Sequence, residues 1–188
     1  MLRFAVLLAW MLLLPITTSA QTTDTTEATI RIGMIGLDTS HSPAFAKLFN
    51  SDDALDDFRV VAAYPYGSRT IESSYERIPR YTEEVQALGV EIVDSIDELI
   101  ERVDVVLLET NDGRLHLEQA LPVLEAGKPL FIDKPMAASL ADVLALFDAA
   151  DHYGVPVFSA SSLRFQEPML DVRGGSIGRV LGADAYSP

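Results

Sequence analysis

Six short apolar runs recur between residues 30 and 158, and stretches with helix signals separate them. The fourth run, VDVVLL, is apolar at all but one position, as is typical of parallel strands covered by helices on both faces. Alternation of strands and helices predicts a doubly wound parallel α/β sheet. The expected strands span residues 30–35, 58–64, 90–93, 103–108, 130–132 and 155–158.

Helix boundaries are marked by capping residues and glycines. Ser42 followed by Pro43 predicts a helix start after the first strand. Ser95 with Glu98 three residues later is a capping box, which predicts a second start. Further predicted starts and ends are a cap at Ser139, ends at Gly89, Gly127 and Gly154, and a kink at Pro122.

The first 20 residues, MLRFAVLLAWMLLLPITTSA, combine a basic start, an apolar core and small residues before the end. This pattern predicts a secretory signal peptide over residues 1–20 and export to the periplasm or the medium. The apolar core is too short to span a bilayer of about 30 Å, so no stable membrane anchor is expected after cleavage. A polar linker over residues 21–29 is expected to precede a folded domain over residues 30–165.

Composition narrows the classes of partner. The chain has 28 Asp and Glu against 14 Lys and Arg, a formal charge of -14. Nucleic-acid binding is not expected, because neutralising phosphates needs clustered basic residues. The absence of Cys excludes disulfides and thiolate metal sites. The oligomeric state stays open, a homo-oligomer included.

The turn GLDTSH follows the first strand and holds the first candidate site residues. In a dinucleotide-binding fingerprint, three glycines allow the tight turn, the approach of the pyrophosphate and close helix packing. Here Gly36 takes the first place, Asp38 the second and His41 the third, with Thr39 and Ser40 between them. The following helix start offers free N–H groups to phosphates. Taken alone, the motif fits a modified dinucleotide turn and a plain strand–helix turn equally well.

Two other strand ends carry candidate residues. The second strand ends at Tyr64 rather than at the acid that binds the ribose of NAD, and Ser68 with Arg69 can hold the 2′-phosphate of NADP. An ordinary solvated Arg69 is an equal alternative. After the fifth strand, Lys134 lies next to Asp133 and can exchange a proton with a substrate hydroxyl.

The stretch LHLEQALPVLEAGKPLFIDKPMAASLADVLALFDAADHYGVPVFSASSLRF resembles the nucleotide-binding domain of the Gfo/Idh/MocA oxidoreductases, which include glucose–fructose oxidoreductase and inositol dehydrogenase. Those proteins carry Glu-Lys-Pro after strand five, Ala-Gly-Lys before it, and a His that opens the helix after strand four. The matching segments here are Asp133-Lys134-Pro135, Ala126-Gly127-Lys128 and His116. The resemblance runs from about Ile30 to Pro188.

The resemblance implies a Rossmann domain that binds NAD or NADP, a sugar or polyol substrate, and Lys134 as the catalytic acid–base group near the nicotinamide. It also implies a following α/β domain that supplies a catalytic Asp and His. The segment IGRVLGADAY, residues 177–186, resembles the first strand of that domain, so residues 166–188 are expected to begin a truncated second domain. The implied cofactor-binding positions are Gly36, Asp38, Thr39, Ser40, His41, Ser68, Arg69, Asn111, His116, Asp133 and Lys134.

Several residues depart from the family pattern, and they leave alternatives open. Two fingerprint glycines and the ribose acid are absent, and Asn111-Asp112 replaces a Thr-Pro pair. The alternative to an NAD(P)-dependent oxidoreductase is therefore a non-catalytic nucleotide- or sugar-binding module, a truncated or decayed relative. A zinc site formed by Asp38, His41 and His116 is a less favoured third hypothesis. Hydrogen-bonded turn residues account for those side chains better, so no metal is expected.

Overall fold

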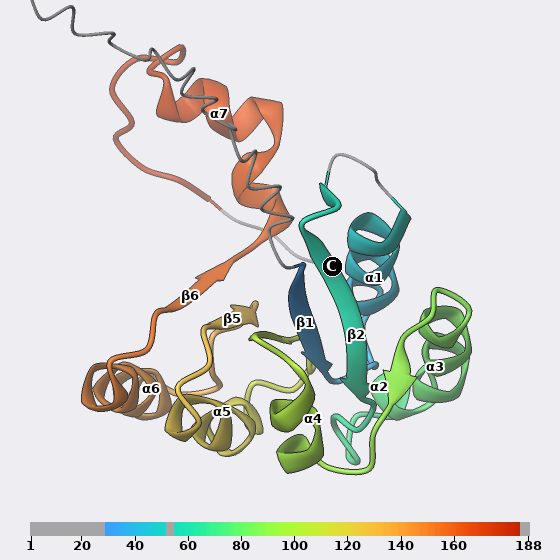
Figure 1. The fold of residues 1–188 in the computed structure, drawn as a ribbon. Coiled ribbons are helices and arrows are strands. Elements are labelled where there is room, and N and C mark those ends of the chain that lie inside the picture. Colours follow the sequence, from blue (N-terminus) through green and yellow to red (C-terminus); the bar gives the residue numbers. More distant parts are fainter. Residues whose placement is uncertain (1–28, 52–54, 185–188) are drawn as a thin grey trace, which may run out of the picture.

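The computed structural model describes residues 29–51 and 55–184, so the predicted signal peptide and nearly all of the predicted linker lie outside the described residues (Figure 1). Six parallel strands form one sheet in the order β3-β2-β1-β4-β5-β6, which is the order of the dinucleotide-binding doubly wound fold. The strands are β1 (Ile30–Ile35), β2 (Phe58–Tyr64), β3 (Glu91–Ile92), β4 (Val105–Leu108), β5 (Leu130–Asp133) and β6 (Val157–Ala160).

The predicted α/β class and all six strands of the domain are confirmed. β1 and β2 have the predicted bounds, β3 is shorter, and β6 begins two residues later than predicted. The helices are α1 (His41–Ser51), α2 (Glu72–Tyr75), α3 (Ile78–Gln86), α4 (Ile96–Arg102), α5 (His116–Glu125), α6 (Leu140–Tyr153) and α7 (Glu167–Arg173), with a 3-10 turn, η2, at Ser162–Phe165.

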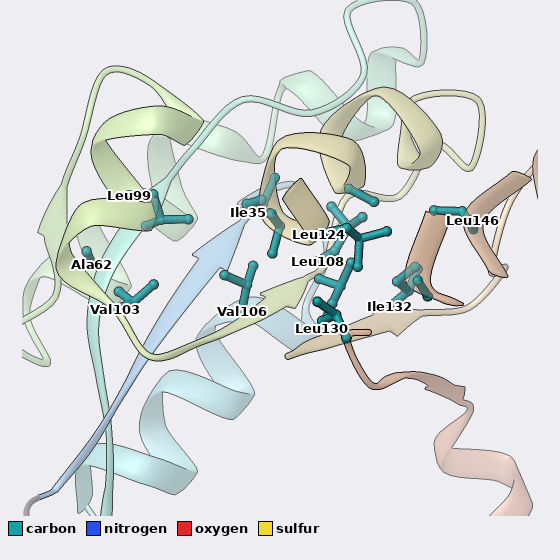
Figure 2. Close-up of a cluster of buried hydrophobic side chains, with 14 of the residues drawn as sticks. Ile35, Ala62, Leu99, Val103, Val106, Leu108, Leu124, Leu130, Ile132 and Leu146 are labelled. Carbon is teal, nitrogen blue, oxygen red and sulfur yellow. The ribbon is translucent and has the colours of Figure 1, made fainter. Parts of the chain in front are cut away.

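Two apolar clusters pack against the two faces of the sheet. Ile35, Val106 and Leu108 of the strands contact α4, α5 and α6 through side chains such as Leu124 and Leu146 (Figure 2). On the opposite face, α1 and α3 cover β1 and β2 (Figure 1). Burial of the strands on both faces explains why their sequences are apolar without alternation.

The predicted caps are confirmed at two helices. The Ser95 hydroxyl accepts the Glu98 N–H at 3.1 Å, and Ser139 caps α6 in the same way. The predicted start, with Ser42 as the cap and Pro43 as the first helical residue, is two residues late, because α1 begins at His41. The Ser42 hydroxyl instead donates to the Gly36 carbonyl at 2.8 Å, which ties α1 to the preceding turn.

The strand predicted over residues 177–186 is absent from its described part, residues 177–184. A strand needs a neighbour for its backbone hydrogen bonds, and no described strand lies beside this segment. Instead, α7 follows β6 and stands apart from the helices that cover the sheet (Figure 1). Among the described residues, no helix has both the length and the apolarity that a bilayer crossing requires.

Candidate cofactor and catalytic site

The carboxyl ends of the central strands bring together loops that are distant in sequence. The register places Ile35 of β1 beside Tyr64 of β2 and Leu108 of β4, and Leu108 in turn beside Ile132 of β5. The residues that follow these strands are therefore neighbours at one edge of the sheet, where doubly wound proteins bind their ligands.

The first turn requires glycine at Gly36. Its φ is +86°, a conformation that residues with a Cβ rarely adopt. A Cβ there would lie 2.4 Å from the Thr110 hydroxyl and 2.6 Å from the Thr110 backbone nitrogen. The turn therefore packs directly against the chain leaving β4, as a tight fingerprint turn does.

Asp38 lies inside the fold, between the loops that follow β2 and β4. It is fully buried, and its carboxylate accepts the backbone N–H of Ser68 at 3.2 Å and of Asn111 at 2.9 Å. Burial raises the pKa of Asp38, and the two N–H donors oppose this shift. The negative charge is thus met by backbone donors of the neighbouring loops, a role that sequence reasoning missed.

The same two loops are joined by a second set of contacts. The Ser68 hydroxyl donates to Asp112 at 2.9 Å, and the Arg114 guanidinium donates to both carboxylate oxygens of Asp112. Arg114, with help from Ser68, lowers the pKa of Asp112 to about 2. The Asn111 side-chain amide donates to the Ser74 hydroxyl in α2 at 2.8 Å. The predicted residues Ser68 and Asn111 thus meet Asp38 in one network.

A cavity of about 670 Å³ lies beside this network, between the loop after β2 and the beginnings of α4 and α5. Arg69 and Arg114 bring positive charge to its wall, and Tyr66 brings an aromatic ring. Its polar rim at the end of β2 is where a doubly wound fold binds the adenosine side of a dinucleotide. The predicted pair Ser68 and Arg69 both line this cavity.

His116 opens α5, as predicted, but its ring is buried and engaged. One ring nitrogen lies 2.6 Å from the Thr110 carbonyl oxygen and the other 3.1 Å from the Met136 carbonyl oxygen. These contacts join the loop after β4 to the segment after β5. Since both ring nitrogens of His116 and the carboxylate of Asp38 are occupied, the trio Asp38, His41 and His116 does not form a metal site here.

Asp133, His41 and Lys134 meet at the end of β5. The His41 ring nitrogen Nδ1 lies 2.7 Å from the Asp133 carboxylate, and the Lys134 ammonium lies 3.6 Å from the same oxygen. The Asp133 side chain is buried, whereas about half of the Lys134 side chain is exposed. A buried carboxylate therefore positions two nitrogen groups, one of which faces solvent.

Glu109 directly follows β4 and lies next to this group, and sequence reasoning missed it. It is fully buried, and neither carboxylate oxygen has a hydrogen-bond partner among the described residues. Burial raises the pKa of Glu109 to about 8, and the nearby charge of Asp133 adds to the shift. The available signal was an acidic residue directly after the nearly all-apolar run VDVVLL.

The residues around the first turn fit a dinucleotide. The Thr110 hydroxyl lies against Gly36, and the Thr39 hydroxyl belongs to the same turn. Both hydroxyls are buried and have no partner within the described parts of the chain. Such orphaned polar groups normally have a partner, here one that a phosphate or a ribose hydroxyl can provide. Ser40 lies exposed at the N-terminus of α1, where backbone N–H groups favour anions.

Known proteins with similar sequences and folds are oxidoreductases. The chain is 33% identical over 96 residues to inositol 2-dehydrogenase of Gluconacetobacter diazotrophicus, covering 48% of this chain and 28% of that protein. It is 26% identical to scyllo-inositol 2-dehydrogenase (NADP(+)) IolW of Bacillus subtilis, and the match covers 77% of this chain and 37% of that protein. The solved structure of a probable dehydrogenase from Thermotoga maritima is 27% identical with a TM-score of 0.59, and the match covers 79% of this chain and 42% of that one.

These coverages mean that the chain spans between 28% and 37% of the length of the two curated relatives. Residues 30–161 match the model of an oxidoreductase family described as having an NAD-binding Rossmann fold. That region contains all of the sheet and every site residue described above. The chain therefore belongs to the Gfo/Idh/MocA oxidoreductase family, and residues 30–161 are the family's NAD-binding domain.

Proposed function

We propose that this chain is the nucleotide-binding part of an NAD(P)-dependent oxidoreductase that acts on a sugar or polyol. The observation that carries the proposal is the position of Lys134 at the carboxyl end of β5, with its ammonium 3.6 Å from the buried Asp133 carboxylate. A half-exposed amine held at a strand end can reach a substrate while its carboxylate neighbour fixes its direction. The inositol dehydrogenases among the relatives support a polyol substrate.

Some of these residues would bind the cofactor, and Lys134 would transfer the proton. Gly36, Thr39 and Thr110 would hold the phosphates, and Ser68 with Arg69 would meet the 2′-phosphate of NADP. When bound, the nicotinamide supplies the hydride acceptor or donor. As the neutral amine, Lys134 would accept the hydroxyl proton when the substrate carbon is oxidised, and as the ammonium it would return that proton when the carbonyl is reduced.

The alternative is a non-catalytic nucleotide- or sugar-binding module. Its support is that Asp38 and His41 stand where the fingerprint has glycines. Under this alternative, the site binds a ligand without turning it over.

Lys134→Met tests the catalytic role, and Lys128→Met is its matched control, because Lys128 lies before β5 at the opposite end of the strand. NADH and NADPH binding would be measured by calorimetry, and turnover would be followed with an inositol and NAD⁺ or NADP⁺. We expect Lys134→Met to bind nucleotide as the parent does but to lose about 100-fold or more in turnover, a typical contribution of an acid–base group. Unchanged turnover in Lys134→Met would refute its role. If the parent binds nucleotide without any turnover, the same pair of variants is compared in a chain extended by a second domain, and absence of turnover there would favour the non-catalytic module.

A further inference from the structure

We propose that His41, Glu109 and Asp133 form a binding site for one divalent transition-metal ion. A ring nitrogen of His41 and one carboxylate oxygen each from Glu109 and Asp133 lie within 4.8 Å of one another. They come from the start of α1 and from the ends of β4 and β5. Within the described residues, this is the one such group of His, Asp and Glu that is close enough to share an ion.

Glu109 provides the main evidence for a bound ion. Its two oxygens are buried and have no hydrogen-bond partner among the described residues. Buried carboxylates in proteins are paired or coordinate metals, because an isolated one is costly. The ammonium of Lys134 contacts Asp133, and it makes no ion pair with Glu109 within 4.0 Å. An ion between the three side chains would provide the missing partner.

The donor types limit the kind of ion. One imidazole and two carboxylates suit Mn²⁺, Fe²⁺ or Zn²⁺ better than they suit Ca²⁺ or Mg²⁺, which prefer oxygen alone. Metal–ligand bonds of about 2.0–2.2 Å need donor atoms about 3–3.5 Å apart. The 2.7 Å contact between His41 and Asp133 must therefore open by less than about 1 Å, and Glu109 must approach.

The site would keep an open position. Three protein ligands leave at least one place on a tetrahedral ion for water or substrate, as in catalytic sites. His41 and Asp133 also line a mostly apolar cavity of about 440 Å³, with Phe45, Phe131 and Phe158 in its wall. A ligand in this cavity would lie beside two of the three proposed metal ligands, His41 and Asp133.

The test measures metal binding without nucleotide or substrate, so its outcome does not depend on the oxidoreductase proposal. Purified, tag-free chain is stripped with EDTA, and Mn²⁺ is titrated while the resonance of free Mn²⁺ is followed by electron paramagnetic resonance. Zn²⁺ is titrated in parallel by thermal unfolding. Glu109→Gln keeps the size of the side chain and removes its charge, and Glu125→Gln makes the same change at an exposed position of α5.

We expect the parent and Glu125→Gln to bind one Mn²⁺ per chain, and Glu109→Gln to bind it at least tenfold more weakly. If Glu109→Gln does not fold, His41→Gln is measured instead and should show the same loss. The proposal is overturned if the parent binds neither Mn²⁺ nor Zn²⁺ stoichiometrically below about 1 mM, a free energy of about 4 kcal/mol. Equal affinity in Glu109→Gln and the parent would overturn it as well, and Glu109 would then be a buried, protonated acid without an ion.

Discussion

Replacing Gly36 by Ala is expected to destabilise the domain through two separate costs. The first is conformational, because a φ of +86° costs an L-residue about 1–2 kcal/mol. The second is steric, since the new Cβ would lie 2.4–2.7 Å from the hydroxyl, nitrogen and Cα of Thr110. Two of these atoms belong to the backbone leaving β4 and cannot rotate away, so a further cost of about 1–3 kcal/mol is typical.

Gly89→Ala is the matched control. Gly89 has nearly the same φ, +84°, but no heavy atom lies within 4 Å of the Cβ that Ala would add. It should therefore lose about 1–2 kcal/mol, the conformational cost alone, against about 2–5 kcal/mol for Gly36→Ala. Urea unfolding followed by circular dichroism measures both, and each kcal/mol should lower Tm by about 3 °C in a chain of this size. Equal losses in the two variants would show that the first turn does not pack against Thr110.

Three further outcomes are expected. The pKa of Asp112 is lowered to about 2, so its interaction with Arg114 stabilises the fold above pH ~4, and this stabilisation is lost between pH ~4 and ~2. In Asp112→Asn, the free energy of unfolding should fall by about 1 kcal/mol less over this pH range, a value that allows for solvent screening. The same pH dependence in the variant and the parent would contradict this prediction. Asp38→Gly leaves two buried N–H groups unpaired, so we expect the free energy of chemical unfolding to fall by about 2–4 kcal/mol. Calorimetry should show no tighter binding of NADH, and tighter binding would mean that the Asp38 carboxylate faces the phosphates. We also propose that residues 1–20 are removed on export, so protein from the periplasm or medium should lack the emission of Trp10, the chain's single Trp, and clear Trp emission would refute this.

The fold could be predicted because its signals are local. Each strand is a short apolar run, and each predicted cap and terminal glycine acts within one turn, as Ser95 and Gly154 do. The strand predicted over residues 177–186 shows the limit of such signals, because its described part, residues 177–184, forms no strand. Its residues favour an extended chain, but a strand forms only where a neighbour offers a ladder of backbone partners.

The site was predicted less completely, because its contacts join distant loops. The position of Lys134 follows from the strand that precedes it. The direction in which the Asp38 side chain points could not be predicted, since its hydrogen-bond partners are backbone groups 30 and 73 residues away. Glu109 was missed because its significance depends on burial and on missing partners, neither of which is visible in sequence spacing. The approach of His41 to Asp133 across 92 residues is likewise a property of the strand order.

The strand order has a consequence for how the chain folds. β1 lies between β2 and β4, so four of its six residues pair with β4, about 70 residues downstream. Parallel pairing of this kind closes long loops before it gains contacts, which slows folding compared with hairpin-based sheets. During synthesis, β1 and β2 can pair early, but His41 must wait until β5 has left the ribosome before it meets Asp133. The 2.7 Å contact between these two side chains therefore marks the addition of β5 to the sheet, and a probe at His41 would report this late step of folding.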